Sequence, residues 1–269
     1  MTDGQGERWR TIWITGASSG IGRALAVELA KPGRRLVLSG RSEERLQAVA
    51  DRCRGIGAET DVLPFEIADE SARFEAIEAV RTQHGVPDML INNAGVSQRA
   101  TAVETRFDVD RWITEVNYMA AVHLTKGFLP EMTARNSGTI VTVSSIAGLV
   151  AARLRSAYNA AKAAQIAFVR TMQNELYRSD VQIALVIPGF VRTEVSGNAL
   201  RGDGGNHGVL DPNQASGMTA ETAARRIVTA LERRRPEIYV GVPPKAQVLL
   251  GLSRFVPGVA TSILRKARV

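Results

Sequence analysis

A glycine-rich turn near the N-terminus restricts the possible fold more than any other part of the sequence. An apolar stretch, residues 11–15, runs into Gly-Ala-Ser-Ser-Gly-Ile-Gly at residues 16–22, and an apolar-faced helical pattern follows. Gly16 lets the chain turn sharply, Gly20 leaves room for a pyrophosphate beside the backbone, and Gly22 allows close helix–strand packing. Free N–H groups and the helix dipole at this helix start favour a phosphate. The pattern predicts a dinucleotide-binding βα unit, with an ordinary tight turn as the alternative.

Strand and helix patterns alternate along the rest of the chain. The predicted strands cover residues 11–15, 36–40, 60–65, 88–92, 138–144, 182–187 and 237–242. The predicted helices after the first cover residues 43–54, 69–84, 109–135, 156–177 and 219–233, with an interruption of the third near Gly127 and Pro130. This alternation implies right-handed βαβ units and a parallel sheet. We therefore predict an α/β fold: a three-layer, doubly wound Rossmann fold with a central parallel sheet of about seven strands.

Length and composition favour one globular domain over residues 1–269, with its core at about 11–242. The chain has 269 residues, of which 45% are hydrophobic and 23% charged. The single cysteine, Cys53, excludes an intrachain disulfide and favours a reducing, cytoplasmic compartment. The N-terminus carries no apolar targeting core, and no apolar run approaches the ~20 residues that span a bilayer.

The net charge of +7 raises the question of an anionic partner. Arginine and lysine are spread along the chain, and aromatic residues make up only 5% of it. Nucleic-acid binding would need a basic stripe with interleaved aromatic residues, so we predict no nucleic-acid partner. A phosphorylated cofactor or lipid headgroups remain compatible with this charge.

A second pattern joins a serine pair at a strand end to a tyrosine and a lysine. Tyr158 and Lys162 are four residues apart, so they share one face of a helix, and Ser145 can reach the same crevice. A carbonyl reduction needs a proton donor; a nearby ammonium lowers the pKa of a phenol, and a serine hydroxyl polarises the substrate oxygen. The alternative is a half-buried tyrosine and a surface lysine on an ordinary amphipathic helix.

Six segments, taken in order, resemble the short-chain dehydrogenase/reductase family in its single-domain form. They are residues 15–22, 92–95, Asn117, Ser144-Ser145, 158–162 and Pro188-Gly189. The resemblance covers residues 11 to about 242. It implies an oxidoreductase that interconverts a carbonyl and a secondary alcohol on a small-molecule substrate. It also implies a homo-oligomer, a dimer or tetramer built on the helices at 109–135 and 156–177.

The resemblance also implies a role for each matching residue. Tyr158 would be the general acid/base, and Lys162 would lower its pKa and bind the nicotinamide ribose. Ser145 would hold the substrate oxygen, with Ser144 as the less favoured choice, and Asn117 would help to position a water in a proton relay. The implied cofactor-binding residues are Gly16, Ser18, Ser19, Gly20, Ile21, Gly22, Arg41, Ser42, Glu66, Ile67, Asn93, Ala94, Gly95, Tyr158, Lys162, Pro188, Gly189, Val191 and Thr193. Glu66 departs from the aspartate that the family usually has beside the adenine.

The end of the second strand predicts which dinucleotide binds. An NAD site has a carboxylate there to accept from the ribose 2′-OH. This sequence has Gly40, then Arg41 and Ser42, and an arginine fork can pair with a 2′-phosphate. We predict a preference for NADP(H), with NAD(H) possible. The alternatives are an NAD-linked alcohol dehydrogenase and a catalytically silent dinucleotide sensor or scaffold.

No histidine has partners at metal-ligand spacing, so we predict no metal site.

Two segments outside these motifs are expected to shape the substrate site. The glycine-rich loop at 194–217 is long enough to form a lid. The tail at 246–269 is apolar with a basic end, and Pro257-Gly258 divides it into two short helical pieces. We expect the tail to pack within the protein, for example across the cleft. Burial in an oligomer interface and peripheral contact with a membrane, with a lipid-like substrate, are the alternatives.

Overall fold

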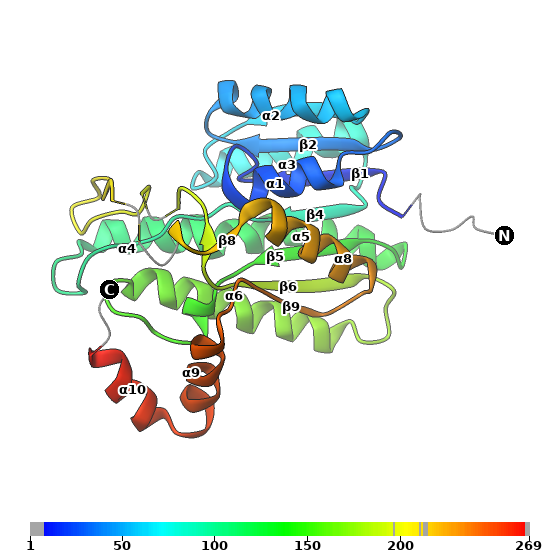
Figure 1. Ribbon diagram of the computed structural model, residues 1–269. Helices are drawn as coiled ribbons and strands as arrows, with labels where there is room; N and C mark the ends of the chain where they lie inside the picture. Colours follow the sequence, from blue (N-terminus) through cyan, green and yellow to red (C-terminus); the bar gives the residue numbers. More distant parts are fainter. Residues whose placement is uncertain (1–7, 196, 210, 212–214, 267–269) are drawn as a thin grey trace.

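The computed structural model describes residues 8–195, 197–209, 211 and 215–266. Seven parallel strands form one sheet in the order β3-β2-β1-β4-β5-β6-β9 (Figure 1). These strands are β1 (Thr11–Thr15), β2 (Arg35–Gly40), β3 (Glu59–Pro64), β4 (Met89–Asn92), β5 (Thr139–Val143), β6 (Gln182–Pro188) and β9 (Glu237–Val240). A separate parallel pair joins β7 (Val191–Arg192) to β8 (Met218–Thr219). The predicted doubly wound sheet of seven strands is confirmed.

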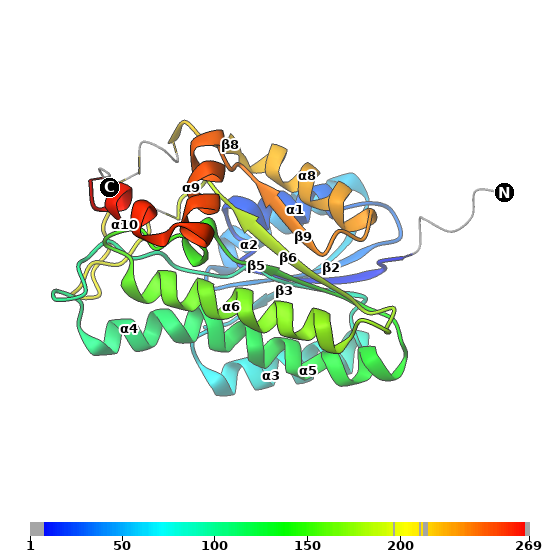
Figure 2. The same ribbon diagram turned by 90° about the horizontal axis from the view of Figure 1, so that it is seen from below.

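Helices cover both faces of the sheet and complete three layers (Figure 2). The helices are α1 (Gly20–Leu29), α2 (Glu43–Ile56), α3 (Glu70–His84), α4 (Phe107–Thr114), α5 (Ala120–Ala134), α6 (Ser156–Glu175), α8 (Ala220–Glu232), α9 (Pro244–Phe255) and α10 (Pro257–Lys266). A π-helical turn, η1 (Glu115–Met119), joins α4 to α5, and a short 3-10 turn, η2 (Ile146–Gly148), follows β5.

The core consists of two apolar layers, one on each side of the sheet. Helices α1, α2 and α8 pack their buried faces on one side, through residues such as Leu25, Leu46 and Ile227. On the other side, α3, α5 and α6 pack around Trp13 and Phe128, whose rings meet edge to face at 5.8 Å. Because the central strands are buried on both faces, their sequences are rich in Ile, Val and Thr and show no regular alternation of apolar and charged residues.

The strand order places a crevice beside the first strand. The chain winds outward through β1, β2 and β3, then returns to β4 on the other side of β1. Neighbouring strands therefore lead into loops that diverge at their carboxyl ends. Open α/β sheets bind ligands at such a switch point, so the fold alone indicates where to look for a site.

The long helical region at 109–135 differs from its prediction. The interruption expected near Gly127 and Pro130 is absent, because α5 runs through both residues. Gly127 serves packing instead: a Cβ there would lie 2.8 Å from Ile77 on α3. The irregular turn of this region is instead η1, which contains Asn117 and ends eight residues before Gly127.

The C-terminal tail is also placed differently from its prediction. It forms two helices, α9 and α10, and the break falls just before Pro257, as expected. The two helices pack mainly on each other, and Ala260 is the only residue of the pair that is buried. The expected packing within the protein body is therefore wrong, because too little of this tail's apolar surface is covered.

Candidate active site

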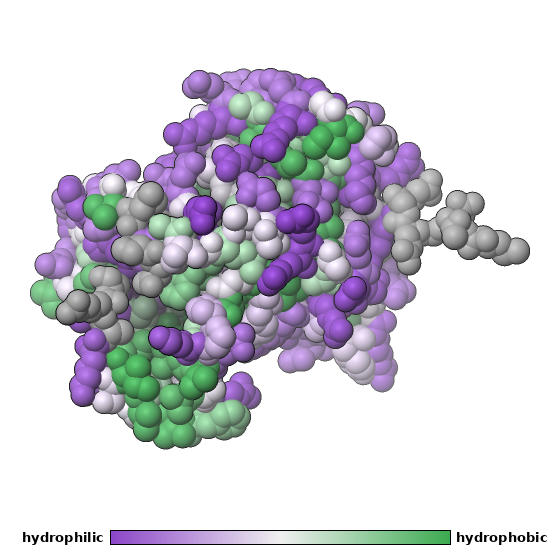
Figure 3. Space-filling model, in the orientation of Figure 1, coloured by the Kyte–Doolittle hydropathy of each residue, from purple (hydrophilic) through white to green (hydrophobic). Residues whose placement is uncertain are grey.

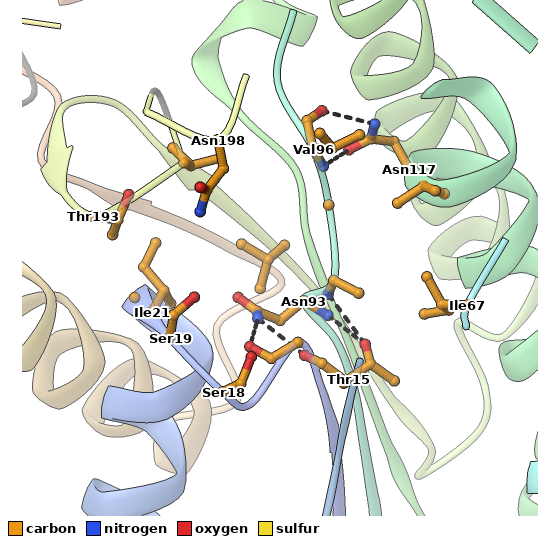
Figure 4. Close-up of a pocket in the computed structure, with 18 of the residues that line it drawn as sticks. Thr15, Ser18, Ser19, Ile21, Ile67, Asn93, Val96, Asn117, Thr193 and Asn198 are labelled. Carbon is orange, nitrogen blue, oxygen red and sulfur yellow. Dashed lines mark hydrogen bonds between the residues drawn. The ribbon is translucent and has the colours of Figure 1, made fainter. Parts of the chain in front are cut away.

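A pocket opens at the carboxyl ends of the parallel strands, at the predicted switch point (Figure 4). Its walls come from the β1–α1 turn, from the loops after β2 to β6, and from the start of the predicted lid. It is lined by all the predicted catalytic residues and by every predicted cofactor-binding residue except Gly22 and Ser42. Figure 4 shows Ser18, Ser19 and Ile21 on one wall, with Thr193 and Asn198 reaching in from the lid side.

The β1–α1 turn has the geometry of a phosphate cradle. Gly16 and Gly20 adopt φ of +63° and +53°, in the left-handed region that favours glycine. Ser19 is the N-cap of α1 but its side chain makes no cap hydrogen bond, so the N-cap side chain leaves the first N–H groups of the helix available. Uncapped N–H groups facing a pocket at a helix start are an anion site.

Gly22 lies behind this cradle and serves packing, not lining. An added Cβ would lie 2.2 Å from the Gly16 carbonyl oxygen and 2.4 Å from the Asn93 amide nitrogen. That amide donates to the carbonyl oxygens of Thr15 and Gly16, at 3.0 and 3.1 Å, and so holds the turn. Asn92, by contrast, turns away and donates to Thr125.

Ser145, Tyr158 and Lys162 meet on one side of the pocket. Tyr158 forms a hydrogen bond with Ser145, and the Lys162 ammonium lies 5.8 Å from the centroid of the tyrosine ring. Lys162 is only 4% exposed, and its Nζ donates to the Val143 carbonyl oxygen at 2.9 Å. Ser144 is buried and donates to the Lys162 carbonyl oxygen instead. The structure therefore brings Ser145, not Ser144, to the tyrosine.

Burial is the main cause of the pKa shifts of Tyr158 and Lys162. Burial raises the pKa of Tyr158, and the Ser145 hydrogen bond and the charge of Arg155 offset that rise in part. Burial also lowers the pKa of Lys162 to about 7. The sequence predicted that the Lys162 ammonium would lower the pKa of Tyr158. In this structure that expectation is wrong: the cation acting on the tyrosine is Arg155, and desolvation dominates both shifts.

Asn117 is positioned by the π-helical turn. Its side chain forms two hydrogen bonds with the main chain of Val96. The amide nitrogen donates to the Val96 carbonyl oxygen at 3.0 Å, and the amide oxygen accepts from the Val96 N–H at 3.2 Å. Its main-chain oxygen accepts from Gln165. A Cβ on Gly95 would lie 2.7 Å from the Asn117 amide oxygen and 3.4 Å from the Lys162 Nζ. Single π-helical turns are frequent at functional sites, and this one brings Asn117 beside Lys162.

Gln98 supports Tyr158, and no sequence pattern predicted this role. It is fully buried, and its side-chain oxygen accepts from the N–H groups of Ala157 and Tyr158, at 2.9 and 3.4 Å. It thereby caps the start of α6 from 59 residues away. No local pattern marks such a cap. Gln98 does not itself line the pocket; unpredicted residues that do include Trp112, Val116, Val195 and Asn198.

On the cofactor side, Arg41 lines the pocket as predicted, whereas Ser42 does not. Arg41 lines the pocket and is exposed, and it forms no ion pair with a described residue. The Ser42 hydroxyl is already used as the N-cap of α2, where it accepts from the Arg45 N–H. Glu66 lines the pocket and its carboxylate accepts from the Ala68 N–H, which holds the longer side chain in place.

The described part of the predicted lid lies against the loop before α4. Leu200 forms bridges to Gln98 and joins an apolar cluster with Tyr158 and Trp112. Asp211 pairs with Arg99 and, at 3.1 Å, with Arg155. The lid also places Glu194 on the pocket wall, 3.5 Å from Arg45. Of the apolar residues of this loop, Leu200 and Val209 are described, whereas Leu210 lies outside the described residues.

Comparison with known proteins supports the same interpretation. Residues 10–203 match the family model described as short chain dehydrogenase. The chain belongs to the short-chain dehydrogenase/reductase family. It is therefore an oxidoreductase. Dehydrogenase/reductase SDR family member 7B of Xenopus tropicalis is 38% identical over 246 residues, covering 89% of this chain and 80% of that one. The SDR family protein 7-like of Drosophila melanogaster is 34% identical, covering 97% of this chain and 81% of that one.

Solved short-chain dehydrogenases have the same fold with dinucleotides bound. One from Sphingobium yanoikuyae, in complex with NADPH, has a TM-score of 0.78 at 25% identity, covering 96% of each chain. One from Burkholderia phymatum, in complex with NAD, has a TM-score of 0.81 at 26% identity, covering 93% of this chain and 95% of that one. These neighbours support NAD(P) binding by the family fold here, without deciding between the two dinucleotides.

The residues present fit a nicotinamide dinucleotide. The cradle at Gly16 and Gly20 has uncapped N–H groups for a pyrophosphate, and Lys162 lies buried beside the residues that would surround the nicotinamide. The residues that would hold the dinucleotide are those that the family resemblance implied, except Gly22 and Ser42.

Across the described ranges, no group of three His, Cys, Asp or Glu side chains could hold a metal ion, and no helix has the length and apolarity to cross a bilayer.

Proposed function

We propose that this enzyme is an NADP(H)-preferring reductase of the short-chain family. It interconverts a carbonyl and a secondary alcohol on a moderately apolar small molecule or a lipid-like substrate. The observation that supports this most directly is the meeting of Ser145, Tyr158 and Lys162 in one pocket with the glycine-rich cradle. A chain that only sensed dinucleotides would need the cradle but not this second group.

Each residue of the group has a distinct proposed task. A bound nicotinamide dinucleotide supplies the hydride. Ser145 holds the substrate oxygen, and the Tyr158 hydroxyl, which remains protonated at neutral pH because its pKa is raised, donates the proton. Lys162 binds the nicotinamide ribose, and Asn117 positions a water that relays protons to it.

The wall opposite the cofactor cradle supports an apolar substrate. Tyr158 packs with Val96, Trp112 and Leu200 around a small cluster centred on Val109 and Ile113. Trp112 and Val96 also line the pocket itself. A substrate held between these side chains and the tyrosine would bury apolar surface while its carbonyl faces Ser145.

Transfer of a labelled hydride tests the proposed chemistry. The protein is incubated with NADPH carrying deuterium at the reactive carbon and with a panel of aliphatic and aromatic ketones. We expect deuterium at the carbinol carbon of the alcohol product, detected by mass spectrometry. Tight NADPH binding without transfer to any ketone of the panel would instead favour the silent sensor.

Arg41 is expected to determine the preference for NADPH. Replacing it with alanine removes the charge proposed to pair with the 2′-phosphate, a hydrogen-bonded ion pair worth about 1.5–3 kcal/mol. We expect the Kd for NADPH to rise by roughly 10–150-fold, while the Kd for NADH stays unchanged. Both constants can be measured by fluorescence titration of the reduced nucleotide.

A matched variant separates this contact from general charge. Arg52→Ala removes an exposed arginine from α2, outside the pocket, and should leave both constants unchanged. If Arg41→Ala left the ratio of the two constants as it is in the parent, an NAD-linked dehydrogenase would be the better interpretation. Glu194 favours neither cofactor here, because its carboxylate is already paired with Arg45.

Two further expectations remain part of the proposal. The enzyme acts as a dimer or tetramer that joins copies through the α4–α5 region and α6. It works in the cytoplasm, where its one cysteine stays reduced. Cys53 is buried, and burial raises the pKa of its thiol to about 11, so it is unreactive in the folded chain.

A further inference from the structure

The C-terminal hairpin, defined here as α9 and α10 (Pro244–Phe255 and Pro257–Lys266), exposes an unusual amount of apolar surface. Five large apolar side chains of the hairpin region are at least 46% exposed, and Phe255 is 79% exposed. They are Val248, Phe255, Val256, Val259 and Ile263. Figure 3 shows the hairpin as a continuous green projection from a mainly purple and white surface.

The charges of the hairpin all have one sign. Residues 241–269 contain no aspartate or glutamate. Lys245, Arg254, Arg265 and Lys266 are exposed, and none of them forms an ion pair with another described residue. The Arg254 guanidinium lies 6.0 Å from the centroid of the Phe255 ring, so cationic and apolar groups alternate on the same surface.

We propose that the C-terminal hairpin docks the enzyme on the surface of a bilayer that contains anionic lipid. Apolar side chains enter the headgroup boundary, and the cations contact the lipid phosphates and carboxylates. Each basic residue near such a surface adds about 1 kcal/mol of attraction. The helices have 12 and 10 residues, too short for the ~20 needed to span, so they lie on the membrane instead of crossing it.

The same charges argue against a second copy of the chain as the occupant. A two-fold interface places one patch against the identical patch of its partner. Here that contact would oppose four described cations with four more and offer no carboxylate between them. Juxtaposed like charges cost several kcal/mol at an interface. An anionic lipid surface matches both the apolar and the cationic side chains.

The hairpin is well placed for this role. Figures 1 and 2 show α10 at the same end of the molecule as the loop before α4, the end where the strands finish and the pocket opens. That loop carries Val103 and leads to Phe107, which are 97% and 76% exposed. Docking through the hairpin would therefore bring the pocket end of the enzyme close to the bilayer.

Sedimentation with lipid vesicles tests the proposal on the full chain. We expect the vesicle-bound fraction to be low on phosphatidylcholine alone and to rise at least about tenfold when phosphatidylserine is included. Added salt should reverse the rise, because it screens the attraction. Equal binding to both vesicle types, or no binding to either, would overturn the proposal.

Paired variants assign the binding to the hairpin. Phe255→Ser with Val259→Ser, and separately Arg265→Gln with Lys266→Gln, should each reduce binding to the anionic vesicles about tenfold or more. The controls are Phe74→Ser, an exposed aromatic residue on α3, and Arg226→Gln with Arg233→Gln, which removes two exposed charges from the α8 region.

Three readouts keep these variants interpretable. Thermal melting and NADPH affinity should stay at parental values, because the substituted side chains are exposed and none lines the pocket. Light scattering reports the oligomeric state of each variant. Controls that lose as much vesicle binding as the hairpin variants would overturn the assignment. So would a parental dimer that dissociates on the hairpin substitutions, since the hairpin would then be an interface between copies.

Discussion

Replacing Tyr158 with phenylalanine is expected to lower kcat for ketone reduction by about 10²–10⁴-fold, the usual contribution of a positioned proton donor. The ring remains to fill its place among Trp112 and Leu200, so the fold and the pocket walls are kept. The hydroxyl is lost, and with it the group, hydrogen-bonded to Ser145, that is proposed to give a proton to the substrate oxygen. Steady-state kinetics with NADPH and a ketone accepted by the parent measure the change.

Tyr177→Phe is the matched control. Tyr177 is 70% exposed, lies just beyond α6 and does not line the pocket, so its loss should leave kcat unchanged. NADPH affinity should stay parental in both variants, which separates a catalytic defect from a binding defect. A Tyr158→Phe enzyme that turned over at the parental rate would require a different acid, and the assignment of Ser145 and Lys162 would lose its basis.

The features that the sequence predicted well are those that depend on neighbouring residues. Buried strands such as residues 139–143 consist of β-branched residues, and the β1–α1 turn is marked by glycines whose positions follow from local backbone geometry. Tyr158 and Lys162 share a face because they are one helical turn apart. Each of these depends on fewer than ten consecutive residues.

The features that were missed depend on contacts between distant segments. Gln98 caps α6 from another loop, and Asp211 pairs with Arg99 and Arg155, which lie 112 and 56 residues earlier in the chain. The acid–base prediction failed for the same reason. Spacing shows that an ammonium can approach a phenol, but it does not show that both groups are buried, and burial determines their pKa values.

The tail shows a different limit. The sequence predicted two apolar helical pieces with a break at Pro257, and both helices form. The periodicity of an apolar face does not identify what covers that face, because a core, an interface and a membrane all favour the same residue types. The burial of Ala260 alone, with Phe255 left exposed, argues against the core. The charges of the hairpin then favour an anionic membrane over an interface between copies.

Replacing Lys162 with methionine is expected to change activity and stability in opposite directions. The variant loses the group proposed to bind the ribose and to receive protons, so kcat should fall by about 10²-fold or more. Lys162 is also a buried cation whose pKa is lowered to about 7 by desolvation. An uncharged side chain of similar length avoids that desolvation cost but leaves the Val143 carbonyl without its donor.

The pH dependence of the stability change identifies its cause. Below pH 7 both folded and unfolded chains carry the ammonium, so the full cost of burying it is present. Between pH 7 and the unfolded value of 10.5, the unfolded chain binds more protons, so the parent gains stability as pH rises. Urea unfolding should therefore find Lys162→Met more stable than the parent by about 1–3 kcal/mol at pH 6. The difference should shrink with pH and reverse near pH 10, where only the lost hydrogen bond remains. A difference that stayed constant from pH 6 to pH 10 would mean that packing, and not the buried charge, accounts for it.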